Sequence, residues 1–323
     1  MRMLLIAGWS LAAVLPSVVA SSLEDVSLHF STNTAIVWRA PTNHLPTRFW
    51  TYKIVPQVFS ATAISNGIVL AGFEKKGFPR PSTSDVVLWA DHPDMEPRPP
   101  YFAIHPSNGQ MSFTLGDRSP DSTKDIARDA AAVRRALKCA TLLGVDSKDL
   151  APTNSATAGT YGVFLTRQID GVRFLDDTEG LQVQFGKDGK IRQFTLLWPK
   201  LVRDESCAIA SPEEIVRCIR GAKTVLVPAD EEGNYFAQVK EMARARRITI
   251  TQITAHYGEG AIGEEVQDNQ PAKWVRPIAI LGGTADFGTN TMFVRIYAPI
   301  LRADVRRLLG SRAENIPGRA PGR

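Results

Sequence analysis

The sequence lacks the motifs by which the commonest catalytic and nucleotide-binding sites are recognised. It contains no G-x-S-x-G nucleophile elbow, no H-E-x-x-H zinc motif, no Walker loop and no dinucleotide-binding glycine fingerprint. Each of these motifs holds a nucleophile, a metal or a phosphate through a defined backbone geometry. No catalytic residue and no cofactor is therefore predicted from motifs, and a protein without catalytic activity is expected.

Histidine is scarce, and its spacing gives no metal site. Ligands for zinc recur at short, fixed separations along the chain. The histidines are scattered, so we predict no metal-binding residue. They are His29, His44, His92, His105 and His256.

Cysteine is also scarce, with three residues in the chain. A Cys207–Cys218 disulfide is one prediction, because an exported protein meets oxidising conditions. The alternative is that Cys218 is a buried thiol, because it shares a helix face with Ile215. Cys139 has no sequence partner of the kind that activates a thiol, so it is not predicted to be a nucleophile.

Only the N-terminus carries a long apolar run. Arg2, the stretch "MLLIAGWSLAAVL", Pro16 and the small residues before Ser21 have the order of a cleaved export signal covering residues 1–20. The alternative is an uncleaved anchor at the short end of what spans a bilayer. Both alternatives predict an extracytoplasmic protein, secreted, periplasmic or anchored, whose membrane contact is confined to this segment.

The body of the chain has no large excess of positive or negative charge. The net charge of +5 is concentrated in residues 302–323, a stretch with six arginines that we expect to be a disordered basic tail. The rest is close to neutral, so the sequence gives no broad electrostatic footprint for nucleic acid.

The remaining chain predicts three α+β units, at residues 21–118, 119–203 and 204–301. In the central unit, a helix is expected between a cap at Asp121 or Ser122 and Gly144. Its predicted apolar face is Ile126, Ala130, Val133, Leu137 and Ala140. "YGVFLTRQI", "LQVQFG" and "KIRQFTLLW" alternate like half-buried strands, and a turn at Gly189 joins the last two. The third unit begins with a capping box at Ser211 and Glu214.

The pattern "YGVFLTRQIDGVRF…GLQVQFGKDGKIRQFTLLWPKL", preceded by a cationic helix, resembles a family of cystatin-like modules. These include PepSY modules, fungalysin/thermolysin propeptides and the YycH/YycI-type regulators of a sensor kinase. Arg167, Asp170, Gly171, Gly189 and Trp198 occupy the positions of the family pattern. The resemblance implies tandem units, each a helix packed on a curved antiparallel sheet. It also implies an exported regulatory, inhibitory or binding role towards a protein or peptide, which would bind in a groove between helix and sheet.

Two acidic regions are candidate sites. Asp170, Asp176, Asp177 and Glu179 lack the D-x-[DN]-x-[DN]-G spacing of a calcium loop, so solvated turns are expected there. His256 with Glu259 or Glu264 is the alternative catalytic prediction, a secreted hydrolase with its pocket under the curved sheet.

Overall fold

The computed structural model describes residues 33–73, 78–82, 86–90, 101–115, 130–151, 157–159, 162–175, 179–186, 190–221, 224–229, 244–259 and 274–310. Residues 1–20, which were predicted to be an export signal, and Gly189 lie outside these residues. The chain divides into two units. Unit 1 takes the chain up to Lys53 and again from Arg203, and unit 2 takes Ile54–Val202. Both units combine helices with sheets that are mainly antiparallel, which confirms the α+β class.

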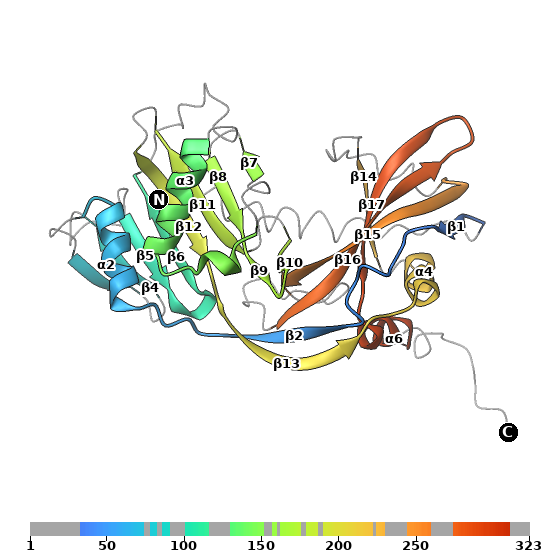
Figure 1. Ribbon diagram of the computed structural model, residues 1–323, viewed down its shortest axis with the longest axis horizontal. Helices are drawn as coiled ribbons and strands as arrows, with labels where there is room; N and C mark the ends of the chain where they lie inside the picture. Colours follow the sequence, from blue (N-terminus) through green and yellow to red (C-terminus); the bar gives the residue numbers. More distant parts are fainter. Residues whose placement is uncertain are drawn as a thin grey trace, which may run out of the picture. The chain divides into compact units, whose positions relative to one another are not determined.

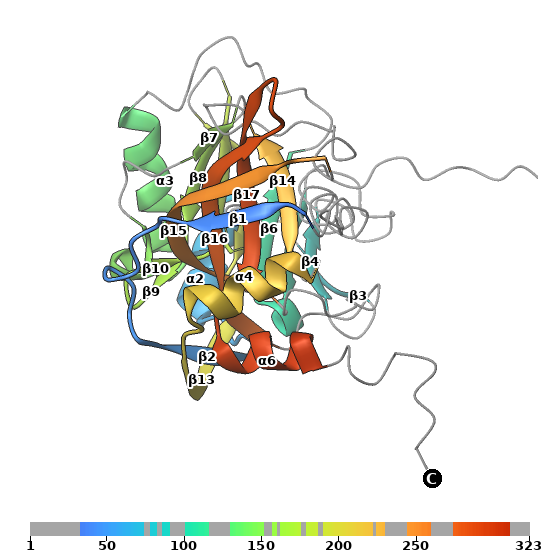
Figure 2. The same ribbon diagram turned by 90° about the vertical axis from the view of Figure 1, so that its right-hand side faces the viewer.

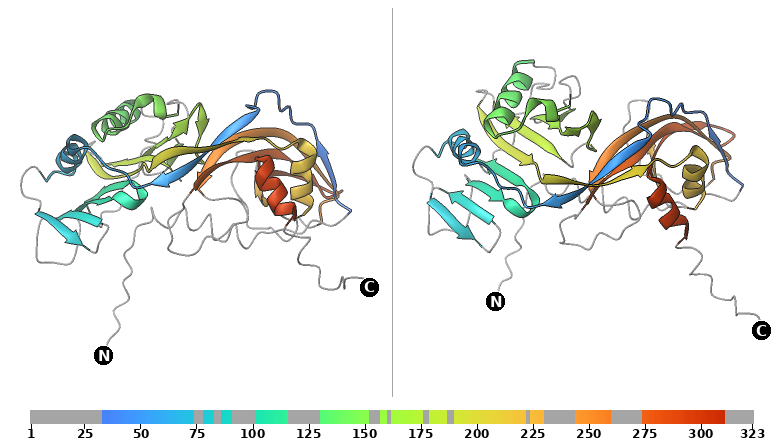
Figure 3. Two further views of the ribbon diagram at one scale, coloured as in Figure 1. Left: turned by 90° about the horizontal axis from the view of Figure 1, so that it is seen from below. Right: turned by 60° about the horizontal axis from the view of Figure 1, so that its bottom comes forward.

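Unit 2 is built on one eight-stranded antiparallel sheet in the order β3-β4-β5-β6-β12-β11-β8-β7. Helix α2 precedes one half of this sheet, strands β3 to β6, and helix α3 precedes the other half, strands β7, β8, β11 and β12. Figures 1 and 3 show both helices on the same face. A separate two-stranded hairpin, β9–β10, is attached. The elements are α2 (Ala61–Leu70), β3 (Phe78–Ser82), β4 (Val86–Ala90), β5 (Tyr101–His105), η1 (Pro106–Asn108), β6 (Gln110–Thr114), α3 (Ala130–Leu142), η3 (Ser147–Asp149), β7 (Thr157–Gly159), β8 (Gly162–Thr166), β9 (Gln168–Ile169), β10 (Val172–Arg173), β11 (Gly180–Phe185) and β12 (Ile191–Leu197).

The core of unit 2 follows from the alternation that the strands display in sequence. Leu181, Val183 and Phe185 are buried against the helices, as their period of two predicts. The buried face of helix α3 differs in part from the predicted one. Its buried residues are Ala132, Ala136, Cys139 and Ala140, so Ala140 is confirmed, whereas Ala130 is exposed. The small side chains let α3 approach the sheet closely, and the larger Val133 and Leu137 pack at its margins.

Unit 1 has a sheet in the order β1-β15-β16-β17-β14, in which β1 and β15 are parallel and the other pairs along this path are antiparallel. Strand β2 pairs with β13 and with the start of β16. Helices α4 and α6 lie next to each other against this sheet (Figure 2). The elements are β1 (Ala35–Trp38), β2 (Arg48–Val55), β13 (Lys200–Ala208), α4 (Pro212–Arg220), β14 (Val225–Ala229), β15 (Arg247–Glu259), β16 (Trp274–Asp286), β17 (Thr291–Pro299) and α6 (Arg302–Gly310).

The prediction of three separate units is wrong at the first boundary. Strand β6, from the expected first unit, pairs along its length with β12, from the expected second, so both belong to one sheet. Pairing these strands leaves neither half with an open central edge and brings Phe113 beside Phe194 in the common core. The chain before Lys53 instead joins the third expected unit, because β1 pairs with β15.

The prediction of a disordered tail is wrong for its first nine residues, which form α6. Val305 and Leu308, three positions apart, share the buried side of this helix. Asp304 is also buried and accepts a hydrogen bond from Arg276 at 2.5 Å. The arginines predicted a solvated C-terminal segment. Val305 and Leu308, which lie between and after them at i, i+3 spacing, are instead buried, because α6 packs against the sheet.

Unit 1 has two adjacent glycines in the middle of a long strand. Gly282 and Gly283 lie inside β16, opposite an irregularity of β15 between Ile250 and Gln252. A Cβ on Gly283 would come within 2.2 Å of the Thr249 carbonyl oxygen. Glycine is therefore required there by the close approach of two strands, rather than by a turn.

Gly67 provides a test of the packing in unit 2. A Cβ on this helical glycine would lie 2.6 Å from Phe102 Cζ, and Phe102 is fully buried. Gly67→Ala should gain about 1 kcal/mol of helix propensity and lose about 1–3 kcal/mol to overpacking, giving a net loss of stability. Gly310→Ala in α6 meets no atom within 4 Å and serves as the control. Urea unfolding should show a lower midpoint for Gly67→Ala alone, and equal midpoints would contradict the packing.

Candidate binding pocket

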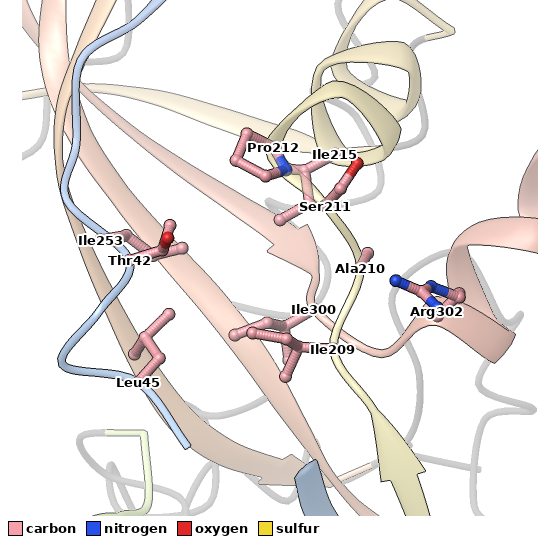
Figure 4. A pocket seen from close by; sticks show the side chains of 10 residues that line it. All are labelled: Thr42, Leu45, Ile209, Ala210, Ser211, Pro212, Ile215, Ile253, Ile300 and Arg302. Atoms are coloured by element: carbon pink, nitrogen blue, oxygen red, sulfur yellow. The ribbon is translucent and has the colours of Figure 1, made fainter. Parts of the chain in front are cut away.

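Unit 1 contains a pocket with a volume of about 180 Å³ beside strand β15. Its walls come from the segment before β2, from the chain leading into α4 and from the end of β17 (Figure 4). Thr42, Ser211 and Arg302 supply the polar groups of the lining. The other lining residues are apolar: Leu45, Ile209, Ala210, Pro212, Ile215, Ile253 and Ile300.

Hydrogen bonds hold these walls in place. Ser211 caps α4 by accepting a hydrogen bond from the Glu214 N–H at 3.3 Å, and Glu214 Oε2 accepts from the Ser211 N–H at 2.9 Å. This is the capping box predicted from the sequence, and it is confirmed. The Ala210 N–H donates to the Ile300 carbonyl at 2.8 Å, which joins the chain before α4 to the chain after β17. A hydrogen bond of 2.9 Å joins His44 Nε2 to the Ile253 carbonyl and fixes the opposite wall.

Glu214 also organises the charged rim of the pocket. Arg302 Nε lies 3.3 Å from Glu214 Oε2, and Arg306 Nε lies 3.9 Å from Oε1. The hydrogen bond from the Ser211 N–H, aided by the nearby Arg302, lowers the pKa of Glu214. Glu214 is therefore an anion at neutral pH and neutralises part of the positive charge that the sequence places after Leu301. Arg302 keeps further N–H donors beyond the one directed at Glu214.

The chemistry of the lining favours binding over reaction. No carboxylate, imidazole or thiol is among the residues that line the pocket, and the Ser211 hydroxyl is engaged as a helix cap. Pockets for drug-sized ligands measure roughly 300–1,000 Å³, whereas an apolar cavity of about 150 Å³ accommodates benzene. The pocket is therefore sized for a single apolar side chain.

Of the family-pattern residues, those that the structure describes lie in unit 2, and none of them lines the pocket of unit 1. Arg167 lies over the ring of Trp198, with its Cζ 4.5 Å from the ring centroid, and 5.6 Å from that of Phe174. Its Nη1 donates to Glu179 Oε2 at 2.7 Å and to the Pro199 carbonyl at 2.8 Å. This group of residues ties the start of β11 to the chain after β12 and has a structural role.

Within the acidic cluster, the prediction of a solvated turn is confirmed for Asp170 and wrong for Glu179. Asp170 and Gly171 both have positive φ, 52° and 78°, and form the turn between β9 and β10, which confirms the predicted turn. Glu179 was predicted to be solvated but is fully buried in the ion pair with Arg167. The signal was present in the sequence. Arg167 directly follows β8 and continues the period of its apolar face, and a buried guanidinium needs a counter-charge. Asp176 and Asp177 lie outside the described residues.

All three cysteines are present as thiols, so the predicted Cys207–Cys218 disulfide is not found. Cys218 is buried on α4 beside Ile215 and Ile219, as the alternative prediction held. Burial of the Cys139 thiol raises its pKa to about 12. The pKa of Cys207 is also raised, first by partial burial and then by the nearby carboxylate of Glu205.

The residues of the hydrolase alternative are only partly described. His256 is half-buried in β15, opposite Ile278 of β16. The backbone of Glu259 ends β15, while its side chain and the whole of Glu264 lie outside the described residues. His44 and His105 lie in different units, and His29 and His92 are not described. Among the described residues, no group of three or more His, Cys, Asp or Glu side chains is placed to hold a metal ion.

Comparison with protein-family models gives no matching family, and comparison with curated protein sequences gives no matching protein. Of the helices within the described ranges, none has both the length and the apolar character that crossing a bilayer requires. The resemblance to cystatin-like modules therefore stays a prediction.

The Arg167–Glu179 pair gives a double-mutant test. Arg167→Met or Glu179→Leu alone should lower the free energy of unfolding by about 3–5 kcal/mol, because each leaves the other charge buried without its counter-ion. The double variant should be more stable than either single variant. Urea unfolding followed by tryptophan fluorescence measures this. Lys148→Ala is the control. It breaks an exposed ion pair with Asp146 and should have a far smaller effect on stability. Additive losses would show that the two side chains are not coupled.

The thiol state can be counted directly. In denaturant without reductant, the purified chain should react with three equivalents of a thiol reagent, whereas one equivalent would reveal the disulfide. In the native state at neutral pH, Cys207 should be alkylated before Cys139. Burial shields the Cys139 thiol from the reagent, and by raising its pKa to about 12 it also suppresses the reactive thiolate. Peptide mass spectrometry after timed alkylation distinguishes the sites.

Proposed function

We propose that the protein is an exported, non-catalytic binding protein that regulates or inhibits a protein or peptide partner. The partner would insert one branched aliphatic or phenylalanine side chain into the pocket of unit 1. The single observation behind this proposal is the lining of that pocket, where four isoleucines and a leucine surround a space of about 180 Å³. A side chain of this kind gains about 1.5–3 kcal/mol on full burial, enough to act as an anchor.

The polar groups of the rim suit a peptide backbone. Thr42 Oγ1 and the remaining N–H groups of Arg302 border the apolar lining (Figure 4). A peptide that enters side chain first brings its own carbonyl groups to such a rim. Hydroxyl and guanidinium donors there would satisfy carbonyls that lose water on binding.

The cystatin-like character is part of the same proposal. In unit 2, each half of the sheet is preceded by one helix that packs on it, which agrees with the arrangement that the resemblance implies. The family is associated with restraint of other proteins outside the cytoplasm, which is the role proposed for this chain.

A peptide-display experiment tests the binding site. Random peptides selected on the chain from Ser21 onward should share one Leu, Ile or Phe. Changing that residue to Ala should weaken binding roughly 10- to 100-fold in calorimetry. Ala210→Leu, which fills the pocket from one wall, and Thr42→Leu, which fills it from the other, should both abolish binding without lowering the melting temperature.

Ala61→Leu introduces the same side chain at an exposed position of α2 and is the matched control. It should bind the selected peptides as the parent chain does. Peptides without a common apolar residue would contradict the proposal, as would unchanged binding by both filled variants.

A further inference from the structure

The connection between β2 and α2 (Figure 1) places one apolar side chain almost entirely in solvent. Val58 is 86% exposed, and the next most exposed large apolar side chain among the described residues is Val69, at 55%. Isolated apolar side chains are common on protein surfaces, so this exposure alone does not indicate a binding site. The backbone around Val58 and the charge of its surroundings give two further observations.

Hydrogen bonds and packing fix the backbone on both sides of Val58. On one side, the Gln57 N–H donates to the Pro106 carbonyl at 2.8 Å. On the other side, Phe59 packs against the core of unit 2, and the Ser60 side chain caps α2. Because this backbone is already ordered, little conformational entropy is lost when Val58 enters a binding site. A valine side chain also has few rotamers to lose.

The segment that contains Val58 carries no charge. Residues 54–73, which include all of α2, have no Lys, Arg, Asp or Glu, although such residues make up 22% of the chain. The turn after α3 lies against Ala63 of α2, and the first charges beyond that turn, Asp146 and Lys148, form an ion pair at 2.9 Å. Charged side chains are depleted at the centres of protein interfaces, because burying an unpaired charge is costly. The surroundings of Val58 therefore suit burial against another protein.

The pocket of unit 1 is complementary to this side chain. Its mainly apolar walls enclose about 180 Å³, a space that holds one branched aliphatic group. The Val58 carbonyl accepts a long hydrogen bond of 3.4 Å from Gln57 Nε2, and a carbonyl oxygen can accept a second one. Thr42 and Arg302, the donors of the pocket lining, can supply it.

Val58 belongs to unit 2 and the pocket to unit 1, so each chain carries both halves of a contact. We propose that the pocket of one copy binds Val58 of a second copy, an inference that rests on the binding role proposed above for the pocket. The contact is heterologous, because a copy that uses its pocket keeps an unused Val58, and copies can therefore join head to tail. An occupied pocket is closed to the peptide partner, so self-association regulates partner binding.

The contact is weak and reversible. Its apolar centre is one side chain, which is far less than the area that stable protein interfaces bury. Valine is also one methylene smaller than leucine or isoleucine, so a partner that inserts either of those gains about fourfold in affinity over Val58 from the pocket itself. The partner can therefore displace the second copy.

Sedimentation velocity of the chain from Ser21 onward, over a wide range of concentration, tests this proposal. The average mass of the parent chain should rise with concentration, and Val58→Leu should strengthen the association about fourfold. Val58→Asp and Ala210→Leu should each stay monomeric. Val69→Ser removes another exposed valine and is the matched control, which should associate as the parent does. A parent chain that stays monomeric, or association that survives in Val58→Asp, would overturn the proposal.

A mixture of the two monomeric variants identifies the pair of surfaces. Val58→Asp keeps its pocket and Ala210→Leu keeps its valine, so the mixture should form pairs and no larger assemblies. Absence of pairs, or growth beyond them, would contradict the head-to-tail contact.

Peptide binding separates this inference from the proposed function. Val58→Asp should still bind the selected peptides, and those peptides should dissociate the assemblies of the parent chain. A parent chain that binds the peptides but stays monomeric would overturn the self-association alone. A parent chain that associates through Val58 but selects no peptide would overturn the peptide partner alone.

Discussion

The pairing of β6 with β12 is the interaction on which unit 2 depends. It joins two halves that each consist of a helix and its strands, and it places Phe113 and Phe194 side by side in a shared core. Without it, each half would have one helix on a small sheet with an exposed central edge, an arrangement that invites aggregation. The same pairing also makes the opposite face continuous, because Ser112 and Thr195 become neighbours only when these two strands meet.

In unit 1, the hydrogen bonds at the start of α4 fix the positions of two helices. The capping box commits Ser211 and Glu214 to each other, and Glu214 then holds Arg302 at the start of α6. One carboxylate thus fixes a helix start and the position of a second helix, and Ile215 extends from the same turn into the pocket. The pocket is a consequence of how the helix begins, rather than of a gap left by poor packing.

Features that depend on neighbouring residues could be predicted from the sequence, whereas features that depend on distant ones could not. The Asp170–Gly171 turn, the capping box and the alternation of Leu181, Val183 and Phe185 are local, and all were confirmed. The sheet that unites β6 with β12 joins residues about 80 positions apart, and a strand pattern does not specify its partner. Glu179 was misassigned because its burial depends on an ion pair with Arg167, which precedes it by twelve residues and lies outside the acidic cluster. The pocket was missed because its lining comes from four separate parts of the chain.

The charge distribution bears on how the proposed pocket would recognise a partner. Three of the arginines after Leu301 lie within 4 Å of Glu214 or Asp304, so the described part of that segment is less cationic than its composition suggests. A nearly neutral body exerts little long-range attraction on charged partners. Recognition must then rest on contacts made after encounter. The pocket would select by volume and apolarity. Such contacts are little affected by ionic strength, because screening by salt acts on charges.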